Sequence, residues 1–340
     1  MALERQAPLS EQSPVAAEAR PILETRGLGR SFSVGGFFSR KRLHAVDGVD
    51  LAIAPREIVA LVGESGSGKS TIARLIARVY RPTAGDIRYH GRSVKTLRSR
   101  KARLAYAARV PMVFQDPYGS LSPVYHVSHG IERSLKLHQP TFSAARRRQE
   151  AERLFDLVGL SPAGEFLGKY PFELSGGQRQ RVGFAQALAC RPELILADEP
   201  VSMLDVSVRI GVLNLMAELR HELGVSFLYI THDIASARYV ADRLIVLYAG
   251  QIAESGPTED VLANPKHPYT QLLLSAVPDP RAEISLPATS VVAEPPRVID
   301  PGEGCRFRAR CPFAIDRCAA ETPRLRPLAP AHDAACHVAH

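Results

Sequence analysis

The chain has 340 residues, of which 45% are hydrophobic and 23% charged, enough for one large domain with a smaller one beside it. No apolar run approaches the roughly 18 to 20 residues that span a bilayer, and the N-terminus lacks the apolar centre of a signal peptide, so we expect a protein that stays in the cytoplasm. The formal net charge of +8 would suit nucleic acid or an anionic membrane face, but a solvated basic surface explains it more simply. Aromatic residues make up only 6% and do not alternate with basic ones as in a platform for single strands, so no direct nucleic-acid binding is expected.

The sequence changes character near residue 22. Residues 1–21 are rich in Pro, Ala, Glu and Ser without periodicity, which predicts a disordered arm. Residues 45–63, "AVDGVDLAIAPREIVALVG", alternate, turn at Pro55 and end in a continuous apolar run. This pattern is typical of a hairpin that leads into a buried strand. Residues 69–79, "KSTIARLIARV", then have helical spacing and no helix breaker.

The middle of the chain predicts helices followed by buried strands. Residues from about 118 to 189 are mostly helical in pattern, with Leu154, Phe155 and Val158 on one stripe opposite basic residues. The apolar runs "ELILADEP" and "GVSFLYITHD" predict buried parallel strands, each followed by a helix, and hence an open α/β sheet. "LIVLYAGQIAESG" predicts a further hairpin. Because no internal repeat is present, we expect a single core.

The last part of the chain holds most of the cysteines. Residues 277–301 are rich in proline and predict an extended linker. Four cysteines follow it, at Cys305, Cys311, Cys318 and Cys336. In a reducing compartment such a cluster more often holds a metal than forms disulfides. The fifth, Cys190, lies in a helix-like stretch, where we expect a small buried hydrophobe.

A glycine-rich loop, "GESGSGKS" at residues 63–70, follows an apolar strand and opens a helix, which is the context of a phosphate-binding loop. Backbone amides and the positive end of the helix can hold phosphate oxygens there. Lys69 would reach the β- and γ-phosphates, and Ser70 would bind Mg²⁺. The alternative is a glycine-rich turn that happens to precede a helix.

Two adjacent carboxylates end the strand in "LILADEP". Asp198 is placed to hold Mg²⁺ through water, and Glu199 to polarise an attacking water. Without the glycine-rich loop, the pair would be read as the N-cap of a helix. His232, at the end of the next strand, could contact the γ-phosphate, although a lone histidine there is more often an ordinary core or loop residue.

Six phrases in this order, "GESGSGKS", "VFQDPYGSLSP", "LSGGQRQR", "LILADEP", "VSMLD" and "YITHD", make the chain similar to ATPase subunits of ABC transporters from about residue 22 to 340. The resemblance implies an α/β P-loop NTPase core with a parallel sheet and an antiparallel β subdomain. It also implies a nucleotide-binding domain over 22–264, with a helical subdomain over about 118–189, and a small cysteine-containing extension over 265–340.

The resemblance implies roles for further residues. "LSGGQ" would face the P-loop of a second subunit, where Ser175, Gly176 and Gly177 close on the γ-phosphate. Gln115 would contact Mg²⁺, Asp205 would cross the dimer interface, and Phe32 would either stack on adenine or pack in the core. The residues expected to bind ATP are Phe32, Gly63, Glu64, Ser65, Gly66, Ser67, Gly68, Lys69, Ser70, Thr71, Ser175, Gly176, Gly177, Gln178 and Asp205. The expected catalytic residues are Glu199, His232, Lys69 and Gln115, and the expected Mg²⁺ ligands are Ser70, Gln115 and Asp198.

Three phrases, "VFQDPYGSLSP", "YPFELSGGQRQRV" and "NPKHPYTQLLLSAVP", resemble the oligopeptide and dipeptide importer branch. The cysteine tail resembles that branch's terminal module, which implies a 4Fe-4S cluster on Cys305, Cys311, Cys318 and Cys336. The spacing is not that of zinc ribbons, and a proline directly after Cys311 is typical of iron-sulfur sequences. Zinc, with His332 or His337 as a substitute ligand, and free thiols stay open as alternatives.

The resemblance also implies partners. A second, similar ATPase subunit, two transmembrane permease subunits and an extracytoplasmic substrate-binding protein would join this chain at the cytoplasmic face of the inner membrane. Peptides are the expected cargo, and oligosaccharides, nickel complexes and glutathione are alternatives. A soluble ABC ATPase acting on nucleic acid or ribosomes is a more distant alternative, because this chain has one core and no heptad run.

Overall fold

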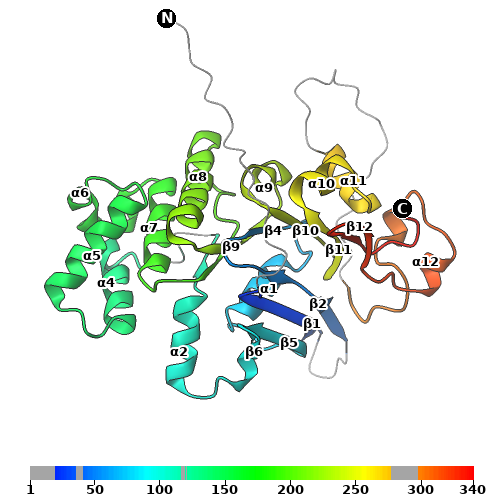
Figure 1. Ribbon diagram of the computed structural model, residues 1–340, viewed down its shortest axis with the longest axis horizontal. Helices are drawn as coiled ribbons and strands as arrows, with labels where there is room; N and C mark the ends of the chain where they lie inside the picture. Colours follow the sequence, from blue (N-terminus) through cyan, green and yellow to red (C-terminus); the bar gives the residue numbers. More distant parts are fainter. Residues whose placement is uncertain (1–19, 36–40, 116–118, 120, 277–297) are drawn as a thin grey trace, which may run out of the picture.

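The computed structural model describes residues 20–35, 41–115, 119, 121–276 and 298–340. Most of the expected arm (1–21), most of the expected linker (277–301) and part of "VFQDPYGSLSP" lie outside these residues. Two sheets and a group of helices make up the part that the structure describes (Figure 1). No helix there is long and apolar enough to span a membrane.

The larger sheet forms the centre of the molecule and, within the described residues, has eight strands in the order β12-β13-β11-β10-β4-β9-β8-β7. Their bounds are β4 Ile58–Val62, β7 Met112–Val113, β8 Leu194–Asp198, β9 Ser226–Thr231, β10 Arg243–Tyr248, β11 Gln251–Pro257, β12 Arg326–Ala329 and β13 His332–Ala334. Strands β7, β8, β9, β4 and β10 are parallel, and β11, β13 and β12 continue the sheet antiparallel. Every residue of β4, β8 and β9 is buried, as in parallel strands with both faces covered. The predicted open α/β sheet and the hairpin of β10 and β11 are confirmed.

The smaller sheet is antiparallel and has the order β2-β1-β5-β6, with β3 paired to β1. Its strands are β1 Leu23–Ser33, β2 Arg42–Val49, β3 Ala52–Ile53, β5 Ala84–Tyr89 and β6 Arg92–Ser93. The expected antiparallel subdomain is therefore present. The hairpin expected to turn at Pro55 is wrong, because β3 before the turn pairs with β1, and β4 after the turn pairs with β9 and β10. The buried strand expected after it is confirmed as β4.

Helices cover the larger sheet and extend to one side of it. They are α1 Lys69–Ile76, α2 Arg100–Arg109, α4 Val127–His138, α5 Ala144–Leu157, α6 Gly164–Leu167, α7 Gly176–Leu188, α8 Val206–Leu223, α9 Ile234–Val240, α10 Thr258–Ala263, α11 Pro268–Ser275 and α12 Arg317–Ala320, with 3-10 turns at Val94–Thr96, Pro171–Glu173 and Arg308–Arg310. Helices α4 to α7 form the predicted helical part, away from the small sheet (Figure 1). Leu154, Phe155 and Val158 are buried there, so the predicted apolar stripe is confirmed.

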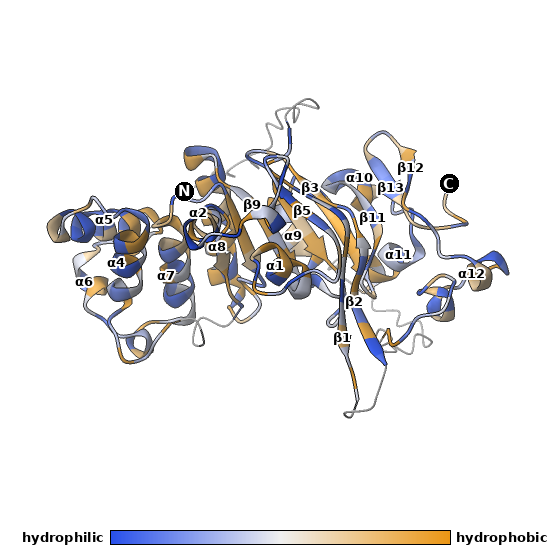
Figure 2. Ribbon diagram, turned by 90° about the horizontal axis from the view of Figure 1, so that it is seen from below, coloured by the Kyte–Doolittle hydropathy of each residue, from blue (hydrophilic) through white to orange (hydrophobic). Residues whose placement is uncertain are grey.

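Strand β4 separates two hydrophobic cores. Ile58, Ala60 and Val62 face a core shared with the helical part, and Val59 and Leu61 face a core shared with α1 and the small sheet. Figure 2 shows the same arrangement, with apolar residues along the central strands and polar residues on the outer faces of α4 and α5. The loop that leaves β4 therefore starts from a rigid, fully buried strand.

The C-terminal extension joins the main sheet instead of forming a separate unit. Strand β13 pairs with β11, with Ala334 opposite Glu254 and Asp333 opposite Ser255. Strand β12 then pairs with β13 at the edge of the sheet. The extension is thus fixed to the same sheet that carries the glycine-rich loop.

Candidate nucleotide site and cysteine module

The glycine-rich loop, residues 63–70, connects β4 to α1 and is enclosed by neighbouring backbone. A Cβ atom on Gly63 would lie 2.2 Å from the Leu247 carbonyl oxygen, and one on Gly68 would lie 2.3 Å from the Ala45 carbonyl oxygen. Both glycines have positive φ angles, 153° and 108°, which residues with a Cβ atom rarely adopt. Gly68 caps α1, whose first turn holds no acidic residue. The free amides and positive end of α1 are therefore available to an anion.

Lys69 is buried at the start of α1, with only 4% of its surface exposed. Its Nζ donates hydrogen bonds to the carbonyl oxygens of Gly63 (2.7 Å) and Glu64 (2.8 Å). Burial lowers the pKa of Lys69, and the nearby carboxylates oppose that effect. The loop thus holds the ammonium group beside the place that phosphates would occupy.

The carboxyl ends of β7, β8 and β9 bring four of the expected catalytic and metal-binding side chains to the edge of the sheet at which α1 begins with Lys69 and Ser70. Ser70 Oγ donates to Asp198 Oδ1 at 2.7 Å. Gln115 Nε2 donates to Glu199 Oε2 at 2.9 Å, and His232 Nδ1 lies 3.4 Å from the same oxygen. These side chains lie together in the structure, and their catalytic and metal-binding roles stay predictions.

Hard oxygen donors suit Mg²⁺, which usually takes one or two protein oxygens and completes its shell with water and phosphate. Ser70 and Asp198 supply such oxygens at the start of α1. Burial raises the pKa of Asp198, and the hydrogen bond from Ser70 opposes the rise. The chemistry of this pair therefore fits the ion, and Gln115 points to Glu199 in the described arrangement.

Most of the other expected ATP-binding residues near this centre lie in the glycine-rich loop and α1, whereas Phe32 lies in β1 of the smaller sheet. Ser65 and Gly66 are exposed at the tip of the loop, Ser67 is buried, and Thr71 is half-buried in α1. Half-buried Phe32 packs edge-on against Tyr80 with a centroid distance of 5.6 Å, and the Arg30 guanidinium lies 4.5 Å from the Phe32 centroid. One face of that ring is therefore already covered by Arg30, and adenine stacking stays a prediction.

Helix α7 starts in the "LSGGQ" phrase with a capping box. Ser175 Oγ accepts from Gln178 N, and Gln178 Oε1 accepts from Ser175 N at 2.9 Å. A Cβ on Gly177 would lie 2.3 Å from a methyl group of Val208 in α8, and Gly176 lies beside Leu204. Asp205 is the N-cap residue of α8, and its side chain accepts no capping hydrogen bond. The capping box uses the amides of Ser175 and Gln178, so an anion at this helix start would meet the amides of Gly176 and Gly177.

Sequence reasoning missed two residues that hold the glycine-rich loop. The Glu64 side chain is turned to Arg310, with two contacts of 2.8 Å, and the Glu64 amide donates to the Tyr269 hydroxyl at 2.9 Å. Arg310 is 246 positions away along the chain. No spacing rule connects two such segments, so only the three-dimensional structure could find this contact.

The four clustered cysteines are free thiols in the C-terminal extension. Cys318 and Cys336 are buried, and the amide of Cys305 donates to the Cys318 carbonyl oxygen at 2.8 Å. Burial raises the pKa of the Cys305 and Cys311 thiols, and the neighbouring cysteines add to the rise. Among the described residues, however, no set of three or more His, Cys, Asp or Glu side chains is arranged to hold a metal ion. The expected iron-sulfur cluster is not supported by this geometry.

The two histidines considered as substitute metal ligands are bonded elsewhere. His332 Nε2 lies 2.7 Å from Glu254 Oε1 in the core, and His337 Nε2 lies 2.9 Å from the Glu321 carbonyl oxygen. Cys190, away from the cluster, is half-buried, and burial raises the pKa of its thiol to about 11. Cys190 therefore stays protonated at neutral pH, as expected of a packing residue.

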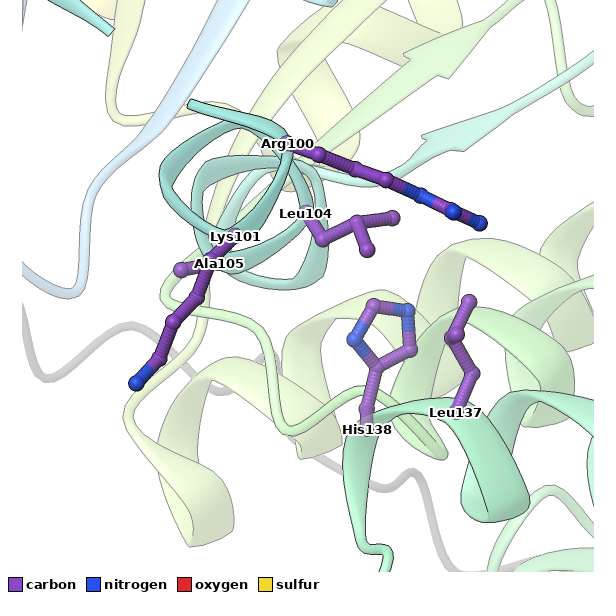
Figure 3. Close-up of a pocket in the computed structure, with 6 residues that line it drawn as sticks. All are labelled: Arg100, Lys101, Leu104, Ala105, Leu137 and His138. Carbon is purple, nitrogen blue, oxygen red and sulfur yellow. The ribbon is translucent and has the colours of Figure 1, made fainter. Parts of the chain in front are cut away.

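A surface hollow of about 540 Å³ lies between α2 and α4. Its lining residues are Arg100, Lys101, Leu104, Ala105, Leu137 and His138 (Figure 3). Burial lowers the pKa of His138, which favours the neutral form of that ring. None of the predicted site residues lines this hollow, which is thus separate from the glycine-rich loop.

Comparisons with known proteins agree with the fold and the loop. Residues 46–202 match the ABC transporter family, and residues 253–318 match the oligopeptide/dipeptide transporter C-terminal region. The oligopeptide transport ATP-binding protein AppF of Bacillus subtilis is 42% identical over 328 residues, covering 95% of this chain and 99% of AppF.

Solved structures show the same core. The dimeric, post-hydrolysis structure of the ATP-binding cassette MJ0796 bound to ADP and Pi has a TM-score of 0.62 and 28% identity, covering 69% of this chain and 98% of that one. CbiO1 of Clostridium perfringens, part of the ABC transporter complex cbiONQ, has the same TM-score and 26% identity, covering 72% of this chain and 92% of its own.

A strand, a phosphate-binding loop, a second strand ending in two acids and a following histidine define a P-loop ATPase of the ABC class. The 42% identity to AppF extends over 95% of this chain, and residues 253–318 match the oligopeptide/dipeptide transporter C-terminal region. Together they narrow the assignment within the ABC class. The chain belongs to the ATP-binding subunits of the oligopeptide/dipeptide ABC transporter family.

Proposed function

We propose that this chain hydrolyses ATP to power the uptake of oligopeptides or dipeptides through partner permease subunits. The observation that carries the proposal is the convergence of Lys69, Ser70, Asp198 and Glu199 at one edge of the sheet in a chain that also has the oligopeptide-type C-terminal region. The named function of AppF, oligopeptide transport, supports the same cargo.

Each side chain has a task that follows from its position. Lys69 and the amides at the start of α1 bind the β- and γ-phosphates, because the ammonium is a cation and the N–H groups carry partial positive charge on the same loop. Ser70 and Asp198 would hold Mg²⁺, which neutralises charge that develops on the phosphates. Glu199 orients and deprotonates the attacking water, and His232 lies where it can contact the γ-phosphate. Gln115 holds the Glu199 carboxylate in place.

The second half of the site comes from another subunit. We propose that Ser175, Gly176, Gly177 and Gln178 close on the ATP of a similar ATPase chain, with Asp205 at the interface between them. The dimeric MJ0796 structure supports pairing of such cassettes. A heteromeric pair of ATPase chains would then sit under two permeases on the cytoplasmic side of the inner membrane and receive cargo from a substrate-binding protein. The division of the chain between residues 264 and 265, into a nucleotide-binding domain and a C-terminal extension, stays a prediction.

Reconstitution of the whole transporter tests this function. The complex is placed in liposomes with its substrate-binding protein, and phosphate release is measured with di- and oligopeptides, oligosaccharides, nickel complexes and glutathione in parallel. Peptides are expected to stimulate hydrolysis by roughly tenfold. Stimulation by another solute alone would overturn the peptide cargo, and retention of the pure chain on polynucleotide at physiological salt would favour the nucleic-acid alternative.

We also propose that Cys305, Cys311, Cys318 and Cys336 hold a 4Fe-4S cluster in the native protein. The four thiols all lie in the C-terminal extension, and the proline directly after Cys311 is typical of iron-sulfur sequences. These sequence features support the proposal, whereas the side-chain positions of the described residues do not. Anaerobic purification should give broad absorbance near roughly 400 nm and about four irons per chain. A colourless protein with zinc, or with neither metal, would overturn the cluster without affecting the ATPase assignment.

A further inference from the structure

The C-terminal extension reaches the phosphate-binding loop through a partly buried ion pair. Arg310 Nη1 and Nη2 each lie 2.8 Å from one of the two oxygens of Glu64. The two side chains are only 13% and 19% exposed, and the guanidinium lies 5.8 Å from the ring centroids of Tyr248 and Phe307. A bidentate pair with this degree of burial fixes the direction of the carboxylate as well as its charge.

The same residue of the loop is held by its backbone. The Glu64 amide donates to the hydroxyl of Tyr269, which lies in α11 and is fully buried. The Tyr269 ring packs against Tyr248 and Phe307, with centroid distances of 4.6 and 5.5 Å. Residues of the C-terminal extension thus bind both the side chain and the backbone amide of Glu64.

A second contact reaches the middle of the loop from the same segment. Arg306, four residues before Arg310, donates to the Ala249 carbonyl oxygen at 2.6 Å and pairs with Asp47. Gly250, which follows Ala249 in the chain, donates a hydrogen bond from its amide to the Ser67 carbonyl oxygen at 2.8 Å. The turn that Arg306 holds is therefore bonded directly to the phosphate-binding loop.

We propose that Arg310, assisted by Tyr269, is a positioning residue that sets the affinity of this chain for ATP. It fixes Glu64, whose carbonyl oxygen, with that of Gly63, holds the Lys69 ammonium. It also neutralises a carboxylate beside the place where a triphosphate must bind. Without Arg310, the carboxylate would be unpaired, the loop would lose its fixed shape, and a like charge would face the incoming phosphates.

This inference rests on the ATP site proposed above, and it adds a role for the C-terminal extension. Residues 306–310, between the first two clustered cysteines, then connect the folding of the cysteine module to nucleotide binding. Loss of that fold would lower ATP affinity from a distance, without any change in Asp198 or Glu199.

Equilibrium binding of a fluorescent ATP analogue with Mg²⁺ to the purified full-length chain tests the inference. Arg310→Ala should weaken binding by roughly tenfold to a hundredfold, Arg310→Lys by less, and Tyr269→Phe by a few-fold. Arg308→Ala is the matched control, because Arg308 is an exposed arginine two residues away in the same turn. It should bind like the wild type.

Two further readouts separate positioning from general loss of structure. In the reconstituted transporter, Arg310→Ala should raise the KM for ATP while kcat at saturating ATP stays within about twofold. In a double-mutant cycle, Arg310→Ala should have a much smaller effect on binding in a Glu64→Gln background, because Arg310 acts through that carboxylate.

Unchanged ATP affinity in Arg310→Ala and Tyr269→Phe, or full additivity in the cycle, would overturn the inference. Lys69→Ala distinguishes this from failure of the ATP site itself: if wild type and Lys69→Ala bind the analogue equally, the site is wrong. If Arg310→Ala does not fold, the smaller changes Arg310→Lys and Tyr269→Phe decide the matter in the same assay.

Discussion

Glu199 has a left-handed backbone, with φ of 47°, directly after the last residue of β8. This conformation is strained for a residue with a side chain, and here it aims the carboxylate at both Gln115 and His232. A carboxylate held in this way is positioned to accept a proton from water.

Glu199→Gln should lower the rate of ATP hydrolysis by at least about 100-fold, because the amide keeps the shape but cannot take a proton. ATP binding should be retained, since the groups expected to bind the phosphates are Lys69 and the amides at the start of α1. Phosphate release and equilibrium binding are measured together. Glu193→Gln is the control, because Glu193 precedes the same strand but pairs with Tyr89 and His90. Hydrolysis within a few-fold of wild type in Glu199→Gln would exclude the assigned role.

Gly68→Ala should strongly destabilise the loop and abolish ATP binding. The new Cβ would meet the Ala45 carbonyl oxygen at 2.3 Å at a φ of 108°, and the strain of such a backbone alone costs about 1 to 3 kcal/mol. Gly66→Ala is the matched control, because its φ is also positive but a Cβ added there would meet no atom within 4 Å. Thermal unfolding should show a larger fall in Tm for Gly68→Ala than for Gly66→Ala. Equal falls would mean that crowding at Ala45 is unimportant.

Sequence reasoning was effective for residues whose geometry is set locally. A strand followed by a glycine loop fixes where Lys69 and Ser70 lie, and parallel strands place Asp198 and His232 at the same edge of the sheet. The partners of Glu64 could not be predicted in this way, because Tyr269 and Arg310 reach it from separate segments of the extension.

At the scale of secondary-structure elements, helix α11 depends on a buried histidine. His267 is 4% exposed, and its Nδ1 accepts a hydrogen bond from Tyr269 N at the start of the helix. Burial lowers the pKa of His267 from 6.5 to about 4. The ring is therefore neutral in the folded chain over a pH range in which it would be protonated in the unfolded chain.

The resulting pH dependence has a definite sign. Between pH 6.5 and about 4 the unfolded chain binds a proton that the folded chain does not, so stability falls as the pH is lowered. The full effect is about 3 kcal/mol. His267→Asn keeps an N-cap acceptor without a titrating group, and its stability should fall less over this range. The free energy of unfolding, measured at several pH values for both proteins, checks this. Parallel curves would contradict it.

Short strands were the elements that the sequence predicted least well. β3 has two residues and β13 has three, so neither shows a clear alternation. Their positions depend on β1 and β11, which supply the pairing edge. Strands β4, β8 and β9, in contrast, are continuous apolar runs in the sequence, and this pattern alone was enough to predict them.

At the scale of the whole molecule, apolar side chains are exposed where α8 begins. Met203 and Val206, on either side of Asp205, are 67% and 71% exposed. Both side chains thus lie largely in solvent in the single chain. An exposed apolar pair beside a predicted interface residue is typical of a surface that another subunit covers.

Met203→Glu should lower peptide-stimulated hydrolysis in the assembled transporter by roughly tenfold, because it places a charge in the closed contact between two ATPase chains. ATP binding to the isolated chain should be unchanged, since Met203 is absent from the contacts of Lys69, Ser70 and Asp198. Leu223→Glu, at the other end of α8 with 45% exposure, is the control for a charge on an exposed apolar residue. Full hydrolysis in the Met203 variant would place the dimer contact elsewhere on the molecule. A loss shared by both variants would show instead that α8 tolerates no added charge, and only a loss confined to Met203 supports closure of two chains around ATP.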